Sequence, residues 1–168
     1  EEATRRLIAA VATVLAWVLL LTCILGVLGA PVLVWALASG LRHSGEAYDA
    51  AVLMTRFMFP YIGFMSMVAL SAGILNTWKH FAVPAASPVL LNLCMIAAAW
   101  LGAPQLQARG IEPIFAMAGG VMLGGVLQLA VQVPALARLG LVPRIGMTWR
   151  AVRAAWAEPG VRRVLMLM

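Results

Sequence analysis

Long stretches without any charged residue dominate the pattern of apolar and polar positions. Four such intervals cover residues 7–41, 57–78, 81–108 and 113–137. Each is longer than the ~20 residues that a helix needs to cross about 30 Å of hydrocarbon. The apolar runs are continuous and lack the alternation of a barrel strand, so in lipid the backbone can satisfy its hydrogen bonds only as helices. The pattern predicts an all-α, polytopic helical membrane protein.

The breaks between these intervals set the expected helix boundaries. Transmembrane helices are expected over residues 1–41, 51–78, 83–104 and 113–138. The first uncharged interval would be roughly 50 Å long at ~1.5 Å per residue, which exceeds one perpendicular crossing. We therefore expect a kink near Pro31, because proline interrupts the helical hydrogen bonding.

The last part of the chain has a different pattern. Thr148 is a suitable N-cap for a short amphipathic helix over residues 148–158, with tryptophans on one face and arginines beside it. We expect this helix to lie at the membrane interface, the alternative being a solvated linker helix. The apolar run at 161–168 predicts the start of another transmembrane helix. Because the chain begins at Glu1 and ends within this run, we expect a segment of a longer protein.

Composition and charge agree with a membrane environment. Hydrophobic residues make up 64% of the chain and charged residues only 11%, against about half and a quarter in soluble domains. The net charge of +6 does not indicate nucleic-acid binding, because the basic residues lie between the apolar runs.

The basic residues are sorted by side if the chain crosses the membrane at each span. Of the twelve, one side holds seven and the other holds only Arg42 and Arg109, when Arg56, Arg162 and Arg163 are left aside as close to or inside helices. The seven are Arg5, Arg6, Lys79, Arg138, Arg144, Arg150 and Arg153. The positive-inside rule places the seven in the cytoplasm, so the first span is expected to run outward.

No residue pattern predicts catalysis, a metal site or a cofactor site. His43 and His80 lie in connections on opposite sides, and the six acidic residues are dispersed. An enzyme needs converging groups, so we do not expect an enzyme. Cys23 and Cys94 each lie within an apolar run and are expected to pack there.

Polar residues within the apolar runs are the candidates for contact with a substrate or a cavity, because such residues are costly in lipid. They are Arg56, Asn76, Asn92, Gln128 and Gln132. For the two glutamines, at i and i+4, the alternative is hydrogen bonding between helices. For Arg56 the alternative is a side chain that extends to the outer interface.

Prolines and glycines are frequent in the spans. The candidates for helix kinks are Pro31, Pro60, Pro84, Pro88 and Pro134. The pairs Gly119-Gly120 and Gly124-Gly125 would allow close helix contact on the fourth span. Interrupted, closely packed helices are typical of transporters, although membrane helices in general tolerate both residue types.

Several motifs on the second to fourth spans occur in a fixed order. They are Phe59-Pro60-Tyr61, Leu75-Asn76-Thr77-Trp78 with Phe81, Pro84-Ala85 with Pro88, Leu91-Asn92, and Gly124-Gly125-Val126-Leu127-Gln128-Leu129 with Gln132 and Pro134. Together they closely resemble the MurJ (MviN) family of lipid II flippases, and the likeness extends along the whole chain.

The resemblance implies a fourteen-helix, two-lobed transporter of the multidrug/oligosaccharidyl-lipid/polysaccharide exporter superfamily, with this chain as its third to sixth helices and the start of the seventh. Such a protein lies in the bacterial inner membrane. It moves lipid II, the undecaprenyl-pyrophosphate-linked peptidoglycan precursor, to the outer leaflet by alternating access for cell wall synthesis. A coupling ion or the membrane potential would drive transport. The family's cationic cavity residues lie mostly outside this chain, so no site residue is transferred.

Three other interpretations are open at this point. A polysaccharide-unit flippase or multidrug exporter of the same superfamily would share the helix order. A non-transporting scaffold would use Asn92, Gln128 and Gln132 as helix contacts and have no wet cleft. A membrane enzyme acting on polyprenyl-linked sugars is disfavoured by the dispersed acidic residues.

Overall fold

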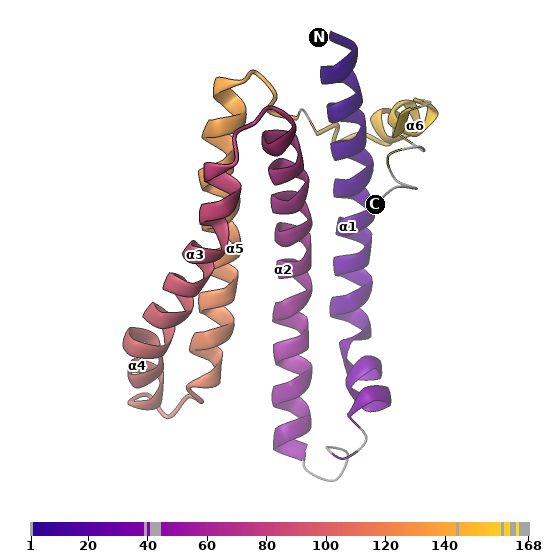
Figure 1. Ribbon diagram of the computed structural model, residues 1–168. Coiled ribbons are helices and arrows are strands. Elements are labelled where there is room, and N and C mark those ends of the chain that lie inside the picture. The colour runs from indigo at the N-terminus through magenta and orange to yellow at the C-terminus, as the bar shows by residue number, and fades with distance from the viewer. Residues whose placement is uncertain are drawn as a thin grey trace.

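The computed structural model consists of long helices (Figure 1), and it describes residues 2–38, 40, 45–143, 145–158, 160, 161 and 164. The helices are α1 (Glu2–Leu37), α2 (Gly45–Thr77), α3 (Ala82–Ala97), α4 (Ala103–Gln107), α5 (Ile114–Arg138) and α6 (Trp149–Ala157). A π-helical turn over Ala98–Gly102 joins α3 to α4. The described part of the chain contains no strand.

Within the described residues, four helices are long and apolar enough to cross a membrane. They are α1, α2, the continuous helix Ala82–Gln107, and α5. The helix α2 begins at Gly45, ahead of the expected residue 51, because Glu46 and Asp49 lie in its first turns, where negative charge favours the helix dipole. Charged residues bound the apolar stretch but do not end the helix. Of residues 161–168, only Val161 and Val164 are described.

The spans are arranged in space as α1, α2, α5 and α3 (Figure 1). The helix α2 packs against both α1 and α5, and α5 packs against α3, whereas α2 and α3 make little contact. The N-terminus, the end of α5 and α6 lie at one end of the molecule (Figure 1). The end of α1, the start of α2 and the α4–α5 connection lie at the opposite end, as alternate crossing requires.

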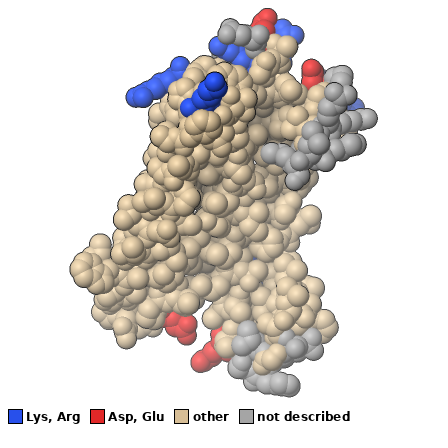
Figure 2. Space-filling model, in the orientation of Figure 1, with Lys and Arg blue, Asp and Glu red and all other residues tan. Residues whose placement is uncertain are grey.

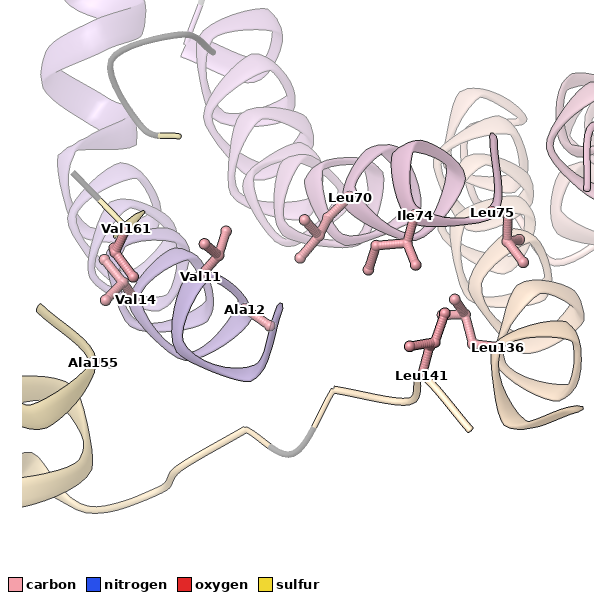
Figure 3. Packing of buried hydrophobic residues seen from close by; sticks show 10 residues of the cluster. All are labelled: Val11, Ala12, Val14, Leu70, Ile74, Leu75, Leu136, Leu141, Ala155 and Val161. Carbon is pink, nitrogen blue, oxygen red and sulfur yellow. The ribbon is translucent and has the colours of Figure 1, made fainter. Parts of the chain in front are cut away.

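The main cluster of buried apolar residues lies at the end that holds the N-terminus. It brings together α1, α2, α5 and the segment around α6, and Leu75 and Leu136 point toward one another there (Figure 3). A smaller cluster of Ala30, Val34 and Val52 joins α1 to α2 at the other end. Between them many large apolar side chains remain exposed, such as Leu28 at 71%, as expected of a surface that meets lipid.

Close packing of α5 against its neighbours depends on glycine. A Cβ atom on Gly120 would lie 2.6 Å from the Ala98 Cβ and 3.1 Å from the Cys94 carbonyl oxygen of α3. Gly124 also meets α3, whereas Gly125 meets Tyr61 of α2. Glycine therefore allows α5 to approach α3 on one side and α2 on the other.

The π-helical turn was not expected from the sequence. It ends where Pro104 stands in the first turn of α4, and the N–H of Ala103 bonds to the Ala98 carbonyl five residues before it. Proline has no N–H for the usual bond, so a change of hydrogen-bond register at this point is physically reasonable. Trp100 in this turn is 82% exposed.

Charged side chains lie mainly at the ends of the bundle (Figure 2). At the end with the N-terminus, the described basic residues are Arg5, Arg6, Lys79, Arg138, Arg150 and Arg153. Arg109 lies at the opposite end, in the α4–α5 connection. Arg42 and Arg144 lie outside the described residues. The bundle thus has one strongly basic end, and its middle is apolar.

Candidate functional site

The five polar candidates within the spans fall into an exposed group and a buried group. Arg56 and Asn76 on α2 and Asn92 on α3 are exposed. Gln128 and Gln132 on α5 are 2% and 0% exposed. The structure therefore brings only the two glutamines together.

The two glutamines converge on one serine of α3. The Gln128 Nε2 donates to the Ser87 carbonyl oxygen at 2.7 Å, and the Gln132 Nε2 donates to the Ser87 Oγ at 2.9 Å. Residues at i and i+4 lie one turn apart on the same helix face, so both amides reach the same partner. Ser87 is itself buried and donates to the Val83 carbonyl at 3.3 Å. The glutamines thus bind α5 to α3.

Ser87 was not singled out from the sequence. The available signal was a small polar residue in an apolar run, placed directly before Pro88. A single small polar residue is too weak a signal to predict this contact, because its partners lie more than 40 positions away in the sequence. Its role depends on the rotation of α5 against α3.

Neither glutamine satisfies its carbonyl group among the described residues. The Oε1 atoms of Gln128 and Gln132 are buried and have no hydrogen-bond partner there. A buried unpaired acceptor costs about 1–3 kcal/mol. The glutamine contact therefore adds specificity to the α3–α5 pairing but less stability than two hydrogen bonds would suggest.

Hydrogen bonds between the spans lie close to prolines. The Tyr48 Oη donates to the carbonyl of Pro31 at 2.8 Å, and the Cys23 Sγ donates to the carbonyl of Phe59, directly before Pro60, at 3.1 Å. The Gln128 bond to Ser87, directly before Pro88, follows the same pattern. A proline removes the N–H partner of the carbonyl four residues before it, so these three carbonyls are not the ones that proline frees, and each bond is an additional contact between two spans.

The proline candidates are not equivalent in position. Pro31, Pro60, Pro88 and Pro134 lie inside helices. Pro84 lies in the first turn of α3, where the missing N–H would have no helical partner in any case. Pro84 therefore suits the start of a helix, and its ring interrupts no helical bond.

Arg56 lies one turn before Pro60 and has no carboxylate within ion-pair distance among the described residues. Its exposed position on α2 fits contact with solvent, with lipid headgroups or with other parts of a larger protein. In the described ranges, no three His, Cys, Asp or Glu side chains gather as metal ligands would. This chain by itself offers helix contacts and exposed polar positions.

The helix α6 is attached to α1 by specific bonds. The Trp17 Nε1 donates to the Gly146 carbonyl at 3.0 Å, and the Gly146 N–H donates to the Thr13 Oγ1 at 3.1 Å. Thr148 caps the helix by accepting from the Ala151 N–H at 3.3 Å. Ala155 is buried, whereas Trp149 is exposed. This geometry orients α6 across the basic end of α1.

Comparison with known proteins identifies the relatives of this chain. A family model described as lipid II flippase MurJ matches residues 1–168. The lipid II flippase MurJ of Burkholderia cenocepacia is 48% identical over 169 residues, which cover 100% of this chain and 31% of that protein. The probable lipid II flippase MurJ of Vibrio cholerae is 35% identical over 98% of this chain and 31% of its own length. That of Haemophilus influenzae is 39% identical over 72% of this chain and 22% of its own length.

The chain thus spans about a third of the length of the curated relatives that it matches. The four helices of the described ranges that could span a membrane, together with these relatives, indicate a multi-pass protein of the bacterial inner membrane. Because the family model matches every residue, this chain belongs to the lipid II flippase MurJ family.

Proposed function

We propose that this chain forms part of a lipid II flippase. The protein would move the undecaprenyl-pyrophosphate-linked peptidoglycan precursor from the cytoplasmic to the outer leaflet for cell wall synthesis. The observation that carries the proposal is the match to the family model over all 168 residues. A relative named lipid II flippase MurJ, aligned over the whole chain, supports this cargo over that of other exporters. The protein would act as a transporter and not as an enzyme.

In this proposal, the segment supplies helix pairs that move as units during alternating access. Transporters of this kind commonly move one group of helices against another around a central site. The glycine contacts of Gly120 and Gly124 favour a rigid α3–α5 pair. The Gln128 and Gln132 bonds to Ser87 fix the register of the same pair.

A second pair, α1–α2, would be held in the same way. Gly26 of α1 leaves space for the Phe59 ring of α2. Cys23 donates to the Phe59 carbonyl of α2, and Tyr48 donates to the Pro31 carbonyl of α1. We propose that the two helix pairs change their relative position at the contact between α2 and α5. Energy would come from the membrane potential or a coupling ion.

Arg56 is the first candidate of this chain for contact with the cargo. A planar guanidinium can donate two parallel hydrogen bonds to a diphosphate oxygen pair. Its exposed position and lack of a carboxylate partner within the described ranges support this role. Asn76 and Asn92, also exposed, are secondary candidates. Gln128 and Gln132 are better assigned to helix pairing, because both are buried against Ser87.

A segment exchange tests the proposed function. The corresponding third of the Burkholderia cenocepacia relative would be replaced by this chain, and the hybrid expressed in cells depleted of their own lipid II flippase. We expect growth and translocation of labelled lipid II to be restored. A hybrid that inserts into the membrane at normal levels but moves no lipid II would contradict the proposal.

A residue-level test follows in the same hybrid. We expect Arg56→Ala to lower lipid II translocation, while Arg109→Ala, which removes an exposed arginine from a connection, leaves it near normal. Equal activity of both variants at equal protein levels would remove Arg56 from the cargo path.

A further inference from the structure

A cleft at the basic end of the bundle has no part in the function proposed above. It has a volume of about 380 Å³, within the range of ligand sites. One wall is the start of α1, with Glu2, Arg5, Arg6, Ile8 and Ala9. The other wall is the segment Gly140–Pro143, which follows α5. The cleft therefore joins two parts of the chain that are far apart in sequence.

The position of Arg5 is set by the end of α5. The helix closes with bonds from the Gly140 N–H to the Ala137 carbonyl and from the Leu141 N–H to the Leu136 carbonyl. Gly140 has a φ of +66°, which favours glycine. A Cβ there would lie 3.0 Å from the Arg5 Nη2. The bare glycine backbone thus lets the guanidinium lie against the turn.

The charges around the cleft favour an anion. Arg5 lines the cleft and has no carboxylate within 4 Å among the described residues. Arg6 lies 3.7 Å from Glu2, but both side chains are largely exposed, and an exposed pair of this kind is weak. Glu2 also lines the cleft and would compete with a bound anion for Arg6. Arg5 is therefore the principal donor.

The position of the cleft along α1 indicates a lipid as the ligand. The charge-free stretch of α1 begins at Leu7, directly after the two arginines. The cleft lies at this boundary between charged and apolar helix surface, the level at which the phosphate groups of a bilayer are expected. Ile8, Ala9 and Leu141 offer apolar contacts beside the guanidinium groups. A ligand with a phosphate and an adjoining apolar part fits both features.

We propose that this cleft binds the headgroup of an anionic phospholipid. The phosphodiester would accept hydrogen bonds from Arg5, assisted by Arg6, and the glycerol backbone would lie toward Ile8 and Leu141. Basic pockets between spans on the cytoplasmic side are suited to anionic headgroups. Arg150 and Arg153 of α6 lie at the same end and would add to the local positive potential.

The test uses the full-length protein in neutral detergent. Short-chain phosphatidylglycerol is titrated, and its apparent affinity is taken from the rise in thermal stability that ligand binding produces. Phosphatidylcholine of the same chain length and sodium phosphate are the comparison ligands. We expect phosphatidylglycerol to stabilise the protein at concentrations at which the other two do not. Equal stabilisation by either comparison ligand would overturn the proposal. Equal stabilisation by phosphate would show that the cleft binds free anions.

Variants locate the site. Arg5→Gln is expected to weaken phosphatidylglycerol binding about fivefold, from ~1 kcal/mol for one arginine near an anionic lipid. Arg109→Gln, which removes an exposed arginine at the other end, is the matched control and should change little. Equal loss in both variants would show a general charge effect and contradict a site at Arg5.

Glu2→Gln provides a test that does not depend on the stability of an arginine variant. It removes the competing carboxylate from an exposed position, so binding of phosphatidylglycerol should become tighter by a factor of about two to five. Unchanged or weaker binding would overturn the proposed site. Arg5→Gln could instead lower the stability of the protein and leave the preference for phosphatidylglycerol intact. That result would assign Arg5 a structural role at the end of α5 and would also overturn the proposal.

Discussion

The contact between α3 and α5 allows a sharp test with two adjacent glycines. Gly120 faces α3, and a Cβ atom there would lie 2.6 Å from the Ala98 Cβ and 3.1 Å from the Cys94 carbonyl oxygen. Gly119, its neighbour on α5, has no atom within 4 Å of the corresponding position. Gly120→Ala and Gly119→Ala therefore make the same chemical change in a close contact and in open space.

The expected magnitude follows from this geometry. Carbon atoms pack best at about 3.5–4.0 Å, so the two helices must separate by roughly 1 Å to accept the new methyl group. Overpacking of this kind costs about 1–3 kcal/mol. Alanine is also a better helix former than glycine by up to ~1 kcal/mol, but this gain is common to both variants. We expect Gly120→Ala to be less stable than Gly119→Ala by about 1–3 kcal/mol.

Two measurements on the full-length protein check this expectation. Thermal unfolding in detergent should show a lower midpoint for Gly120→Ala than for Gly119→Ala. Cys94 is buried beside Gly120, so in a protein with Cys94 as its single cysteine, maleimide labelling should become faster only in Gly120→Ala. Equal midpoints together with equal labelling rates would refute the assigned rotation of α5.

Two further predictions concern the α3–α5 and α1–α2 pairs. Ser87→Ala should destabilise the protein by about 1–3 kcal/mol, because the Gln132 amide is left buried and unpaired. Gln132→Leu should cost less, since it also removes an unpaired carbonyl. The order of the two unfolding midpoints in detergent checks this. Gly26→Ala should lower the unfolding midpoint, because the new methyl group would overlap the Phe59 ring. Gly29→Ala, whose new methyl group meets no atom within 4 Å, should not lower it. Equal midpoints would contradict the α1–α2 packing.

Part of the candidate site could be anticipated from residue type alone. A polar side chain in lipid needs a partner, so Gln128 and Gln132 were predicted either to meet a substrate or to bind another helix. Their i, i+4 spacing indicated a shared face. The choice between the two roles, and the identity of Ser87 as the partner, depend on contacts more than 40 residues apart in sequence. Such contacts have no local signal.

The sequence by itself determined that this is a helical membrane protein and which family it resembles. The thickness of the bilayer and the need to satisfy every backbone hydrogen bond leave few alternatives for long uncharged stretches. Even so, the start of α2 at Gly45 lies outside the charge-free interval, because a helix can continue beyond the hydrocarbon.

Only the tertiary structure decided which neighbour each helix face meets. Gly119 and Gly120 are identical in sequence terms, yet one meets nothing and the other meets α3. The π-helical turn before Pro104 and the attachment of Gly146 to α1 were likewise visible only in the fold. The physical reason is that lipid favours any apolar helix face about equally, so close packing and a few polar bonds between distant residues select one rotation and one partner.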